Sequence, residues 1–320
     1  MARFVVQRLG SMLFVLFAIS VMTFAIFNVI PGGDPAERMA GRHATEPQIE
    51  RIREEWGFDR PLPTQYLVAM QKVVSGDLVS YFSGLDVEDE IAKGLPRTLC
   101  LALGAGLIWM LFASGLGLFC AIRAGGIADR TIGLLAFAGL SMPVFWIGAL
   151  MNHYLGFKLH WFPNGGYVPL TESPSQWLWH MVLPWTALSI VFIGVYSRIL
   201  RANILDTVNQ DFVLTARAKG LSERQVLIRH VLRNSITPIV TLWGLDFGAI
   251  IGGGAILTES VFNLQGIGQY TADAVGQLDL PPLMAVTMLG ASLIVVLNAI
   301  VDILHALLDP RVKLSGREAS

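Results

Sequence analysis

The chain has 320 residues, of which 53% are hydrophobic and only 15% are charged. A typical soluble domain carries about 25% charged residues, so this composition, with a mean hydropathy of +0.57, disfavours both a soluble enzyme and a disordered chain. The formal net charge of −1 offers no case for nucleic-acid binding. Cys100 and Cys120 lie in one apolar run. They cannot form a disulfide within one helix, because their separation there is about 30 Å.

Six windows nearly free of Asp, Glu, Lys and Arg are long enough to cross a bilayer, which needs about 20 mostly apolar residues. They predict an all-α membrane protein with six transmembrane helices. The first helix, with a short cytoplasmic N-terminus, occupies residues 1–30. The others lie in a core of residues 98–308, at 98–122, 131–155, 179–199, 235–258 and 283–306. Helices of a large soluble core are the disfavoured alternative.

The first window also has features of a signal peptide, because Arg3 and Arg8 form a basic start. Its apolar stretch exceeds the usual length of about 7–15 residues, and no small-x-small cleavage site follows. We therefore favour a retained helix.

The distribution of Lys and Arg predicts that both chain ends, including the tail at 309–320, are cytoplasmic. The cytoplasmic connections then contain 14 basic and 6 acidic residues, against 9 basic and 16 acidic outside. Of the short outer loops, only one carries a basic residue, Lys158. Short loops decide orientation, so this asymmetry supports six spans.

The extracytoplasmic segment 31–97 is predicted to form small helices. Thr45 and Gln48 have capping-box spacing, and Gly57 is a plausible stop. Between them, three apolar residues share one face: Ile49, Ile52 and Trp56. A second helix, capped by Thr64, is predicted to carry another apolar face: Leu67, Met70 and Val74. The segment is interpreted as a cap packed on the outer helix ends, as a docking surface for an extracytoplasmic partner, or as both.

The cytoplasmic connection 200–234 is the most informative stretch. A short helix begins at Asp211 and ends at Gly220, and Ser222 with Gln225 forms a second capping box. A basic helix follows and leads into the fifth span; its cations are Arg224, Arg229, His230 and Arg233. Composition alone equally allows a basic amphipathic segment lying on anionic lipid.

The stretch DFVLTARAKGLSERQVLIRHVLRNSITPIV at 211–240 resembles the EAA loop of bacterial ABC-transporter permeases, in the form found in the dipeptide/oligopeptide/nickel importer family. Other pieces match in order: VIPGGDP at 29–35, GFDRPLPTQY at 57–66, GLSMPVFWIG at 139–148, TESVFNLQGIGQY at 258–270 and ALLDPRVK at 306–313. The resemblance covers nearly the whole chain. The long outer segment after the first helix is typical of the first of the two permease types.

The resemblance implies a type I ABC importer permease fold and a non-catalytic permease subunit, and among the family's substrates it favours di- or oligopeptides. It also implies a second permease, two cytoplasmic ATPase subunits that bind ATP and Mg, and an extracytoplasmic solute-binding protein, in a bacterial or archaeal cell membrane. The outer loop 259–282 is expected to touch that binding protein. No cofactor is expected in this chain.

In this family the 211–233 loop carries the closing motion of the ATPases to the membrane helices. Ala216 and Gly220 match the motif's second alanine and its glycine, whereas Leu214 and Thr215 replace its opening Glu and Ala. His230 and Arg233 stand where Ile and Pro are usual. The residues predicted to couple to an ATPase are Asp211, Thr215, Ala216, Arg217, Ala218, Lys219, Gly220, Leu221 and Ser222.

Several catalytic motifs are absent from the sequence. It has no G-x(4)-G-K-[S/T] phosphate loop and no Gly-Lys dipeptide, so we expect no ATP hydrolysis by this chain. It has no H-E-x-x-H, and three histidines stand singly in or near different spans: His153, His180 and His305. A membrane-embedded enzyme is therefore disfavoured. A non-transporting scaffold is a further alternative.

Charged residues inside a membrane are costly and usually face protein or water. Asp246 lies mid-way along the fifth span, before Gly252, Gly253 and Gly254, which permit close packing or a local break. Asp246 either faces the pathway and attracts a cationic group, such as a peptide amino terminus, or makes a structural contact. A proton-coupled secondary transporter using Asp246 and Asp302 is the alternative function.

Other polar and aromatic residues in the spans have mainly structural interpretations. Asp302 is expected to pair with Arg198 or Arg201. Asn152 and Asn298 are expected to form interhelical hydrogen bonds or, less favoured, to line the pathway. Three prolines should bend spans: Pro143, Pro184 and Pro238. Five aromatic residues fit interfacial anchors: Phe145, Trp146, Trp177, Trp179 and Trp185.

Overall fold

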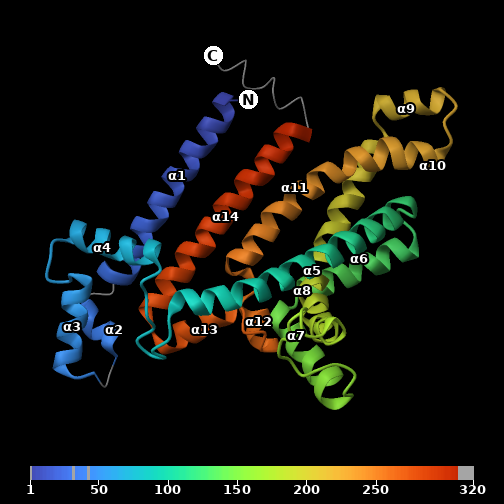
Figure 1. Cartoon of the computed structure of the whole chain (residues 1–320). Helices are drawn as coiled ribbons and strands as arrows, with labels where there is room; N and C mark the ends of the chain where they lie inside the picture. The colour runs from blue at the N-terminus through green and yellow to red at the C-terminus, as the bar shows by residue number, and fades with distance from the viewer. Residues whose placement is uncertain (1, 31–32, 42–43, 309–320) are drawn as a thin grey trace. The chain divides into compact units, whose positions relative to one another are not determined.

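A computed structural model describes residues 2–30, 33–41 and 44–308, and all regular elements in these ranges are helices (Figure 1). The N-terminal part contains α1 (Ala2–Phe24), η1 (Ala25–Val29), α2 (Pro35–Ala40), α3 (Glu46–Trp56) and α4 (Leu62–Ser75). The middle contains α5 (Val87–Ile122), α6 (Ile127–Leu140), α7 (Val144–Met151), η2 (Asn152–Lys158) and α8 (Pro174–Val208). The rest contains α9 (Asp211–Ala218), α10 (Glu223–Gln225), η3 (Val226–Leu232), α11 (Arg233–Ala249), η4 (Ile250–Gly254), α12 (Ile256–Phe262), α13 (Ile267–Gln277) and α14 (Leu280–Leu308).

Five stretches of helix in the described chain are long and apolar enough to cross a membrane: Leu9–Val29, Val87–Ile122, Pro174–Val208, Glu223–Gly254 and Leu280–Ile300. They cover the first, second, fourth, fifth and sixth predicted spans. The third predicted span, 131–155, is not one straight helix. It consists of Ile127–Leu140 and Val144–Lys158, bent by 97°.

The bend in the third span follows from Pro143. Its φ of −62° and ψ of 137° leave the helical region, and proline has no N–H to continue the ladder. Before the break, the Ser141 amide donates to the Phe137 and Ala138 carbonyls, which ends α6. Pro184 and Pro238, by contrast, lie inside α8 and α11.

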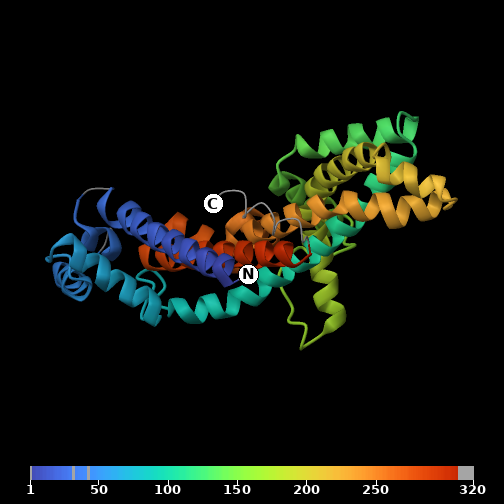
Figure 2. The ribbon, with the colours of Figure 1, turned by 90° about the horizontal axis from the view of Figure 1, so that it is seen from above.

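The chain divides into two compact units. The first consists of the described residues within 1–99, 248–260 and 264–320. In it, α1 packs along α14, and α14 packs against η4 and α13; Figures 1 and 2 both show α1 and α14 side by side. The second consists of residues 100–247 and 261–263. In it, α8 packs against α6 and α7, and η3 packs against α8 and α9.

The outer segment belongs to the first unit and packs as a cap. The capping box of Thr45 and Gln48 opens α3, and Gly57 ends it in the left-handed conformation at φ 64°. Trp56 is 2% exposed and donates to the Tyr81 hydroxyl at 2.7 Å. Its cluster includes apolar side chains from α1 and α14: Phe24, Met284 and Ala285. The cap interpretation is therefore confirmed.

The predicted apolar face of the next helix is correct for Met70 and wrong for Leu67 and Val74. The helix begins at Leu62 and not after Thr64, because a proline in the first turn is compatible with a helix. Leu67 and Val74 are 64% and 87% exposed. The buried side is instead centred on Ala69, with Tyr66, Met70 and Val73 beside it.

Candidate functional site

The segment between α8 and α11 folds as the sequence predicts. Asp211 begins α9, and Gly220 follows it at φ +78°, a conformation that favours glycine. Ser222 and Gln225 form the reciprocal capping box that opens α10. The helix then runs through η3 into α11 without a break (Figure 1). The second of the two predicted short helices is therefore the start of the fifth span.

Buried apolar side chains hold α9 against the helix that follows it. Val213 and Ala216 are 0% and 5% exposed, and Val226 and Val231 on η3 are 1% and 0% exposed. A small residue at 216 suits this close packing, because a longer side chain would push α9 away from η3. Figure 1 shows α9 folded back over the start of this helix.

An ion pair closes the turn on its solvent side. Arg217 donates through Nε and Nη2 to the Glu223 carboxylate, at 2.9 and 3.2 Å. Thr215 Oγ1 donates to the Asp211 carbonyl at 3.0 Å within α9. The remaining predicted coupling residues, Ala218, Lys219, Gly220, Leu221 and Ser222, are all exposed. We call residues 211–225 the coupling hairpin.

Hydrogen bonds that the sequence did not reveal connect α8 to the start of α11, the helix that continues from the coupling hairpin. Ser235, 2% exposed, donates to the Asn203 carbonyl at 3.2 Å and lies 3.0 Å from Thr207 Oγ1. Asn203 Nδ2 donates back to the Ser235 carbonyl at 3.3 Å. Single Ser, Thr and Asn residues in a span carry no signal that distinguishes such a contact.

Asp246 is half-buried in α11 and has one polar partner in the second unit. Tyr196, 1% exposed on α8, donates its hydroxyl to Asp246 Oδ2 at 2.6 Å. Around Tyr196 lies a cluster of aromatic rings: Trp109, Phe192 and Trp243. The sequence did not predict Tyr196 as a partner. The bond supplies the structural contact that was one of the two interpretations of Asp246.

Gly252, Gly253 and Gly254 produce both predicted effects, a break and close packing. Gly253 has φ 135°, which interrupts the helix. A Cβ on Gly290 of α14 would lie 2.7 Å from the Gly252 carbonyl oxygen, so the two backbones are in direct contact. Gly290 was not predicted, because one glycine in an apolar run has no distinctive spacing.

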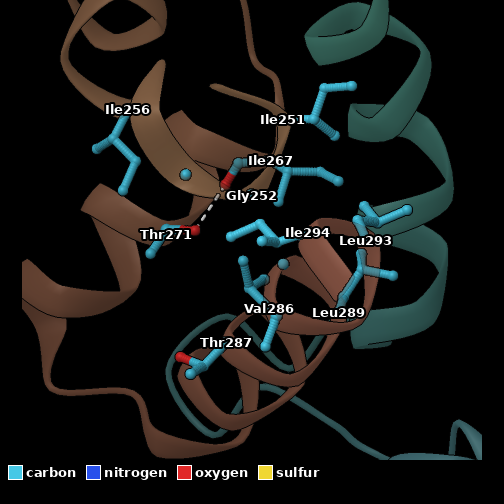
Figure 3. A pocket seen from close by; sticks show the side chains of 13 residues that line it. Ile251, Gly252, Ile256, Ile267, Thr271, Val286, Thr287, Leu289, Leu293 and Ile294 are labelled. Carbon is cyan, nitrogen blue, oxygen red and sulfur yellow. Dashed lines mark hydrogen bonds between the residues drawn. The ribbon is translucent and has the colours of Figure 1, made fainter. Parts of the chain in front are cut away.

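An apolar cavity of about 310 Å³ adjoins this break, between η4, α13 and α14 (Figure 3). Ile251, Val286 and Ile294 lie in its wall. Thr271 is one of its few polar residues, and its hydroxyl donates to the Ile267 carbonyl at 2.8 Å. The cavity offers van der Waals contact and few polar partners.

A buried carboxylate holds the outer connection after α12. Glu259 is fully buried, and its Oε1 accepts from Thr98 Oγ1 at 2.7 Å while Oε2 accepts from the Gln269 amide at 3.0 Å. Burial raises the pKa of Glu259, and the hydrogen bonds from Thr98 and the amides of Gln269 and Gly268 oppose that rise. The Thr98 hydroxyl also accepts from the Ile267 amide at 2.9 Å.

The other polar candidates have diverse surroundings. Asn152 donates to the carbonyls of Asn164 and Val261 at 3.2 and 3.3 Å, which fits interhelical bonding. Asn298 Oδ1 is buried on α14 with no hydrogen-bond partner in the described chain. The side chain of Asp302 lies outside the described residues. Of its two expected partners, Arg201 binds Asp129 at 2.6 and 2.7 Å.

The other expected partner and one predicted anchor also have identified contacts. The Arg198 guanidinium lies 3.6 Å from the centroid of the Phe137 ring. Trp185, interpreted as an interfacial anchor, is instead 7% exposed and donates to the Cys100 carbonyl at 2.9 Å. Its ring fills the space beside Gly104, which explains its burial.

Two sequence models together match nearly the whole chain. The model described as "Binding-protein-dependent transport system inner membrane component" matches residues 113–314, and the corresponding N-terminal model matches residues 1–102. The chain belongs to this family of permeases. The comparisons give no support to the alternative of a proton-coupled transporter.

Curated relatives align with the permease from end to end. It is 34% identical to the "probable peptide ABC transporter permease protein y4tP" of Sinorhizobium fredii, over 98% of this chain and 100% of that protein. The same identity and coverage hold for the "oligopeptide transport system permease protein AppB" of Bacillus subtilis. The "glutathione transport system permease protein GsiC" of Escherichia coli is 34% identical over 98% of this permease and 99% of its own length.

A solved structure shares the fold of the permease. A chain of the inward-facing MetNI methionine ABC transporter matches it with a TM-score of 0.51 and 16% identity, over 68% of this permease and 94% of that chain. At this identity the match shows the fold alone, which is that of an ABC importer permease.

Proposed function

We propose that this permease is one of two transmembrane subunits of an ATP-driven importer for di- or oligopeptides. The importer would receive its substrate from an extracytoplasmic solute-binding protein, in the cytoplasmic membrane of a bacterium or archaeon. The family description names dependence on a binding protein, and relatives of equal similarity are named for peptides, oligopeptides and glutathione. These names support a peptide-like substrate.

The coupling hairpin carries the proposal for the ATPase partner. It combines a buried inner face, formed by Val213 and Ala216, with exposed apolar side chains on the outside: Phe212 (38%), Leu214 (55%) and Leu221 (37%). Neighbouring exposed apolar side chains of this size favour a protein contact. ATP and Mg would be bound by the partner ATPase subunits, and the chain itself would perform no hydrolysis.

The contacts of the hairpin suit it to transmit a displacement. Because α9 is packed on η3 and the helix continues into α11, a push on the hairpin moves the whole fifth span. The hydrogen bonds between Ser235 and Asn203 would transmit the same displacement to α8. At the far end of the span, Gly253 interrupts the helix and supplies a hinge. Two spans would thus move together while the outer end bends.

The translocation pathway is proposed to involve Asp246, with lesser contributions from Asn152 and Asn298. The carboxylate of Asp246 is half-buried and bonded by one oxygen to Tyr196, which leaves the other oxygen for a substrate cation. The outer loop 259–282, held by Glu259, and the cap 31–97 are the proposed contacts for the binding protein.

Transport by the reconstituted complex tests this function. Proteoliposomes would contain the permease with its co-purifying subunits and binding protein, and uptake of radiolabelled trialanine, glutathione and Ni²⁺ would be measured. We expect ATP-dependent uptake of the peptides and co-purification of a protein with a phosphate loop. Uptake driven by a proton gradient without ATP would overturn the importer proposal. ATP-driven uptake of Ni²⁺ alone would overturn only the substrate.

A further inference from the structure

A groove between α6 and α8 has basic and apolar walls. It has a volume of about 820 Å³ and lies within the second unit. Arg130, Arg198 and Arg201 line one part of it, and Leu134 and Phe137 are among the apolar residues that line the rest. The two helices pack against each other, and Figure 2 shows α6 beside α8. None of these residues was predicted to couple to an ATPase or to line the pathway.

The charges in this groove are unbalanced. Asp129 is the one carboxylate among its described lining residues, so three guanidinium groups face one negative charge. Asp129 is committed to Arg201, with two hydrogen bonds at 2.6 and 2.7 Å, and to the Gly125 amide at 2.8 Å. Arg130 and Arg198 are therefore the cations available to an incoming anion, and both are exposed.

The apolar wall continues beyond the arginines onto the open side of α6. Leu134, Leu135 and Phe137 are 69%, 67% and 53% exposed. The guanidinium carbon of Arg198 lies 3.6 Å from the centroid of the Phe137 ring, so this cation is in direct contact with the apolar wall. The groove thus presents cations at one end and a hydrocarbon-compatible surface at the other.

The position along the spans fits the membrane interface. Arg130 is in the first turn of α6 and Arg198 and Arg201 are near the end of α8, the ends that the charge asymmetry places on the cytoplasmic side. Anionic lipid headgroups and basic pockets between spans meet at this level. A free anion would not use the apolar wall.

We propose that the α6–α8 groove binds an anionic glycerophospholipid of the cytoplasmic leaflet. Arg130 and Arg198 donate hydrogen bonds to the phosphodiester oxygens, and an acyl chain lies along Leu134 and Phe137. Asp129 is a positioning residue, because it fixes Arg201 and the turn at Gly125. Arginine suits this role because its planar fork donates two parallel hydrogen bonds to a phosphate.

Lipid retention by the complete transporter tests the site. The complex would be purified in detergent, and its bound lipids would be exchanged for phosphatidylglycerol or for phosphatidylcholine. Native mass spectrometry would then measure the lipid that it retains. Each arginine is expected to contribute as much to the binding free energy as one cation near an anionic membrane surface. The double variant Arg130→Gln/Arg198→Gln should therefore bind phosphatidylglycerol about 30-fold more weakly. The control Arg123→Gln should bind it normally, because Arg123 is exposed over Phe119 and does not line the groove.

A second variant keeps the test decisive if the double variant fails to fold. Gly133 lines the groove and a Cβ there would meet nothing within 4 Å, so Gly133→Leu is chosen to occupy part of the groove with a branched apolar side chain. It should abolish cross-linking of a photoactivatable phosphatidylglycerol to residues 134–140. Three results would overturn the proposal: equal phosphatidylglycerol binding by all variants, displacement of the lipid by millimolar inorganic phosphate, or cross-linking that shows the groove covered by another subunit.

Discussion

The Tyr196 hydroxyl donates a 2.6 Å hydrogen bond to Oδ2 of Asp246 and so joins α8 to α11 within the second unit. The bond orients the carboxylate, and the tyrosine contributes no formal charge to the pair. Tyr196 takes part only in the structural contact of Asp246 and not in its electrostatic role. The two roles can therefore be tested with different variants.

Asp246→Asn should change substrate selection. The asparagine carbonyl can still accept from Tyr196, so the variant removes charge and keeps the contact. We expect uptake of trialanine to fall about 2- to 5-fold, equivalent to ~0.5–1 kcal/mol, while uptake of N-acetyl-trialanine is unchanged. Competitive uptake assays measure this ratio. Tyr196→Phe is the control: it should lower the melting temperature and leave the ratio as it is. Equal losses for both peptides with Asp246→Asn would refute the electrostatic role.

Gly290→Ala should separate α14 from η4. Its Cβ would lie 2.7 Å from the Gly252 carbonyl oxygen, and backbone cannot yield as a flexible side chain does. We expect a loss of about 1–3 kcal/mol in stability, read as a lower unfolding temperature of the purified complex. Gly115→Ala is the matched control in another span, because its Cβ would meet nothing within 4 Å. If both variants melt alike, the backbone contact does not contribute to stability.

Local patterns in the sequence predicted local structure well. Apolar windows located the spans, the Thr45–Gln48 and Ser222–Gln225 boxes located helix starts, and Gly220 and Gly253 located a turn and a break. Each feature depends on a few neighbouring residues, so it can be recognised in the sequence. The bend at Pro143 was predicted, but its 97° angle was not. A proline shows that the helix stops without showing the direction in which the chain continues.

Long-range pairs could not be predicted. Asp246 with Tyr196, Asp129 with Arg201 and Glu259 with Thr98 are 50, 72 and 161 residues apart. Which polar side chains meet depends on how the helices rotate and pack, and several alternatives exist for each carboxylate. The sequence accordingly offered Arg198 or Arg201 as the partner of Asp302, whereas the structure pairs Arg201 with Asp129. Large aromatic side chains are similarly ambiguous, since Trp185 fits an interface as well as a packed core.

Gly220→Ala should weaken coupling through backbone strain alone. A Cβ there meets nothing within 4 Å, but φ is +78°, which costs an alanine about 1–2 kcal/mol. Gly220→Asn should retain more function, because asparagine tolerates this conformation better. The measurement is substrate-stimulated ATPase activity of the complex. Should the alanine and asparagine variants have the same ATPase activity, the conformational argument fails.

Glu259 should make the outer connection sensitive to pH. Burial raises the pKa of Glu259 above its ordinary value of 4.5. Glu259 therefore binds its proton more tightly when the connection is folded than when it is unfolded. The stabilisation of the folded connection by this proton is complete below pH 4.5 and is lost as the pH rises through the pKa of folded Glu259. Hydrogen exchange of residues 259–278, corrected for intrinsic rates, should show greater protection near pH 5 than near pH 8.

Glu259→Gln should abolish this difference, and Glu259→Ala should cost about 2–4 kcal/mol because Thr98 and two amides lose their acceptor. Asp273→Asn, an exposed carboxylate on α13, is the control that should leave the difference intact. Protection that rises with pH in the unmodified permease would show that the hydrogen bonds to the ionised carboxylate outweigh its burial.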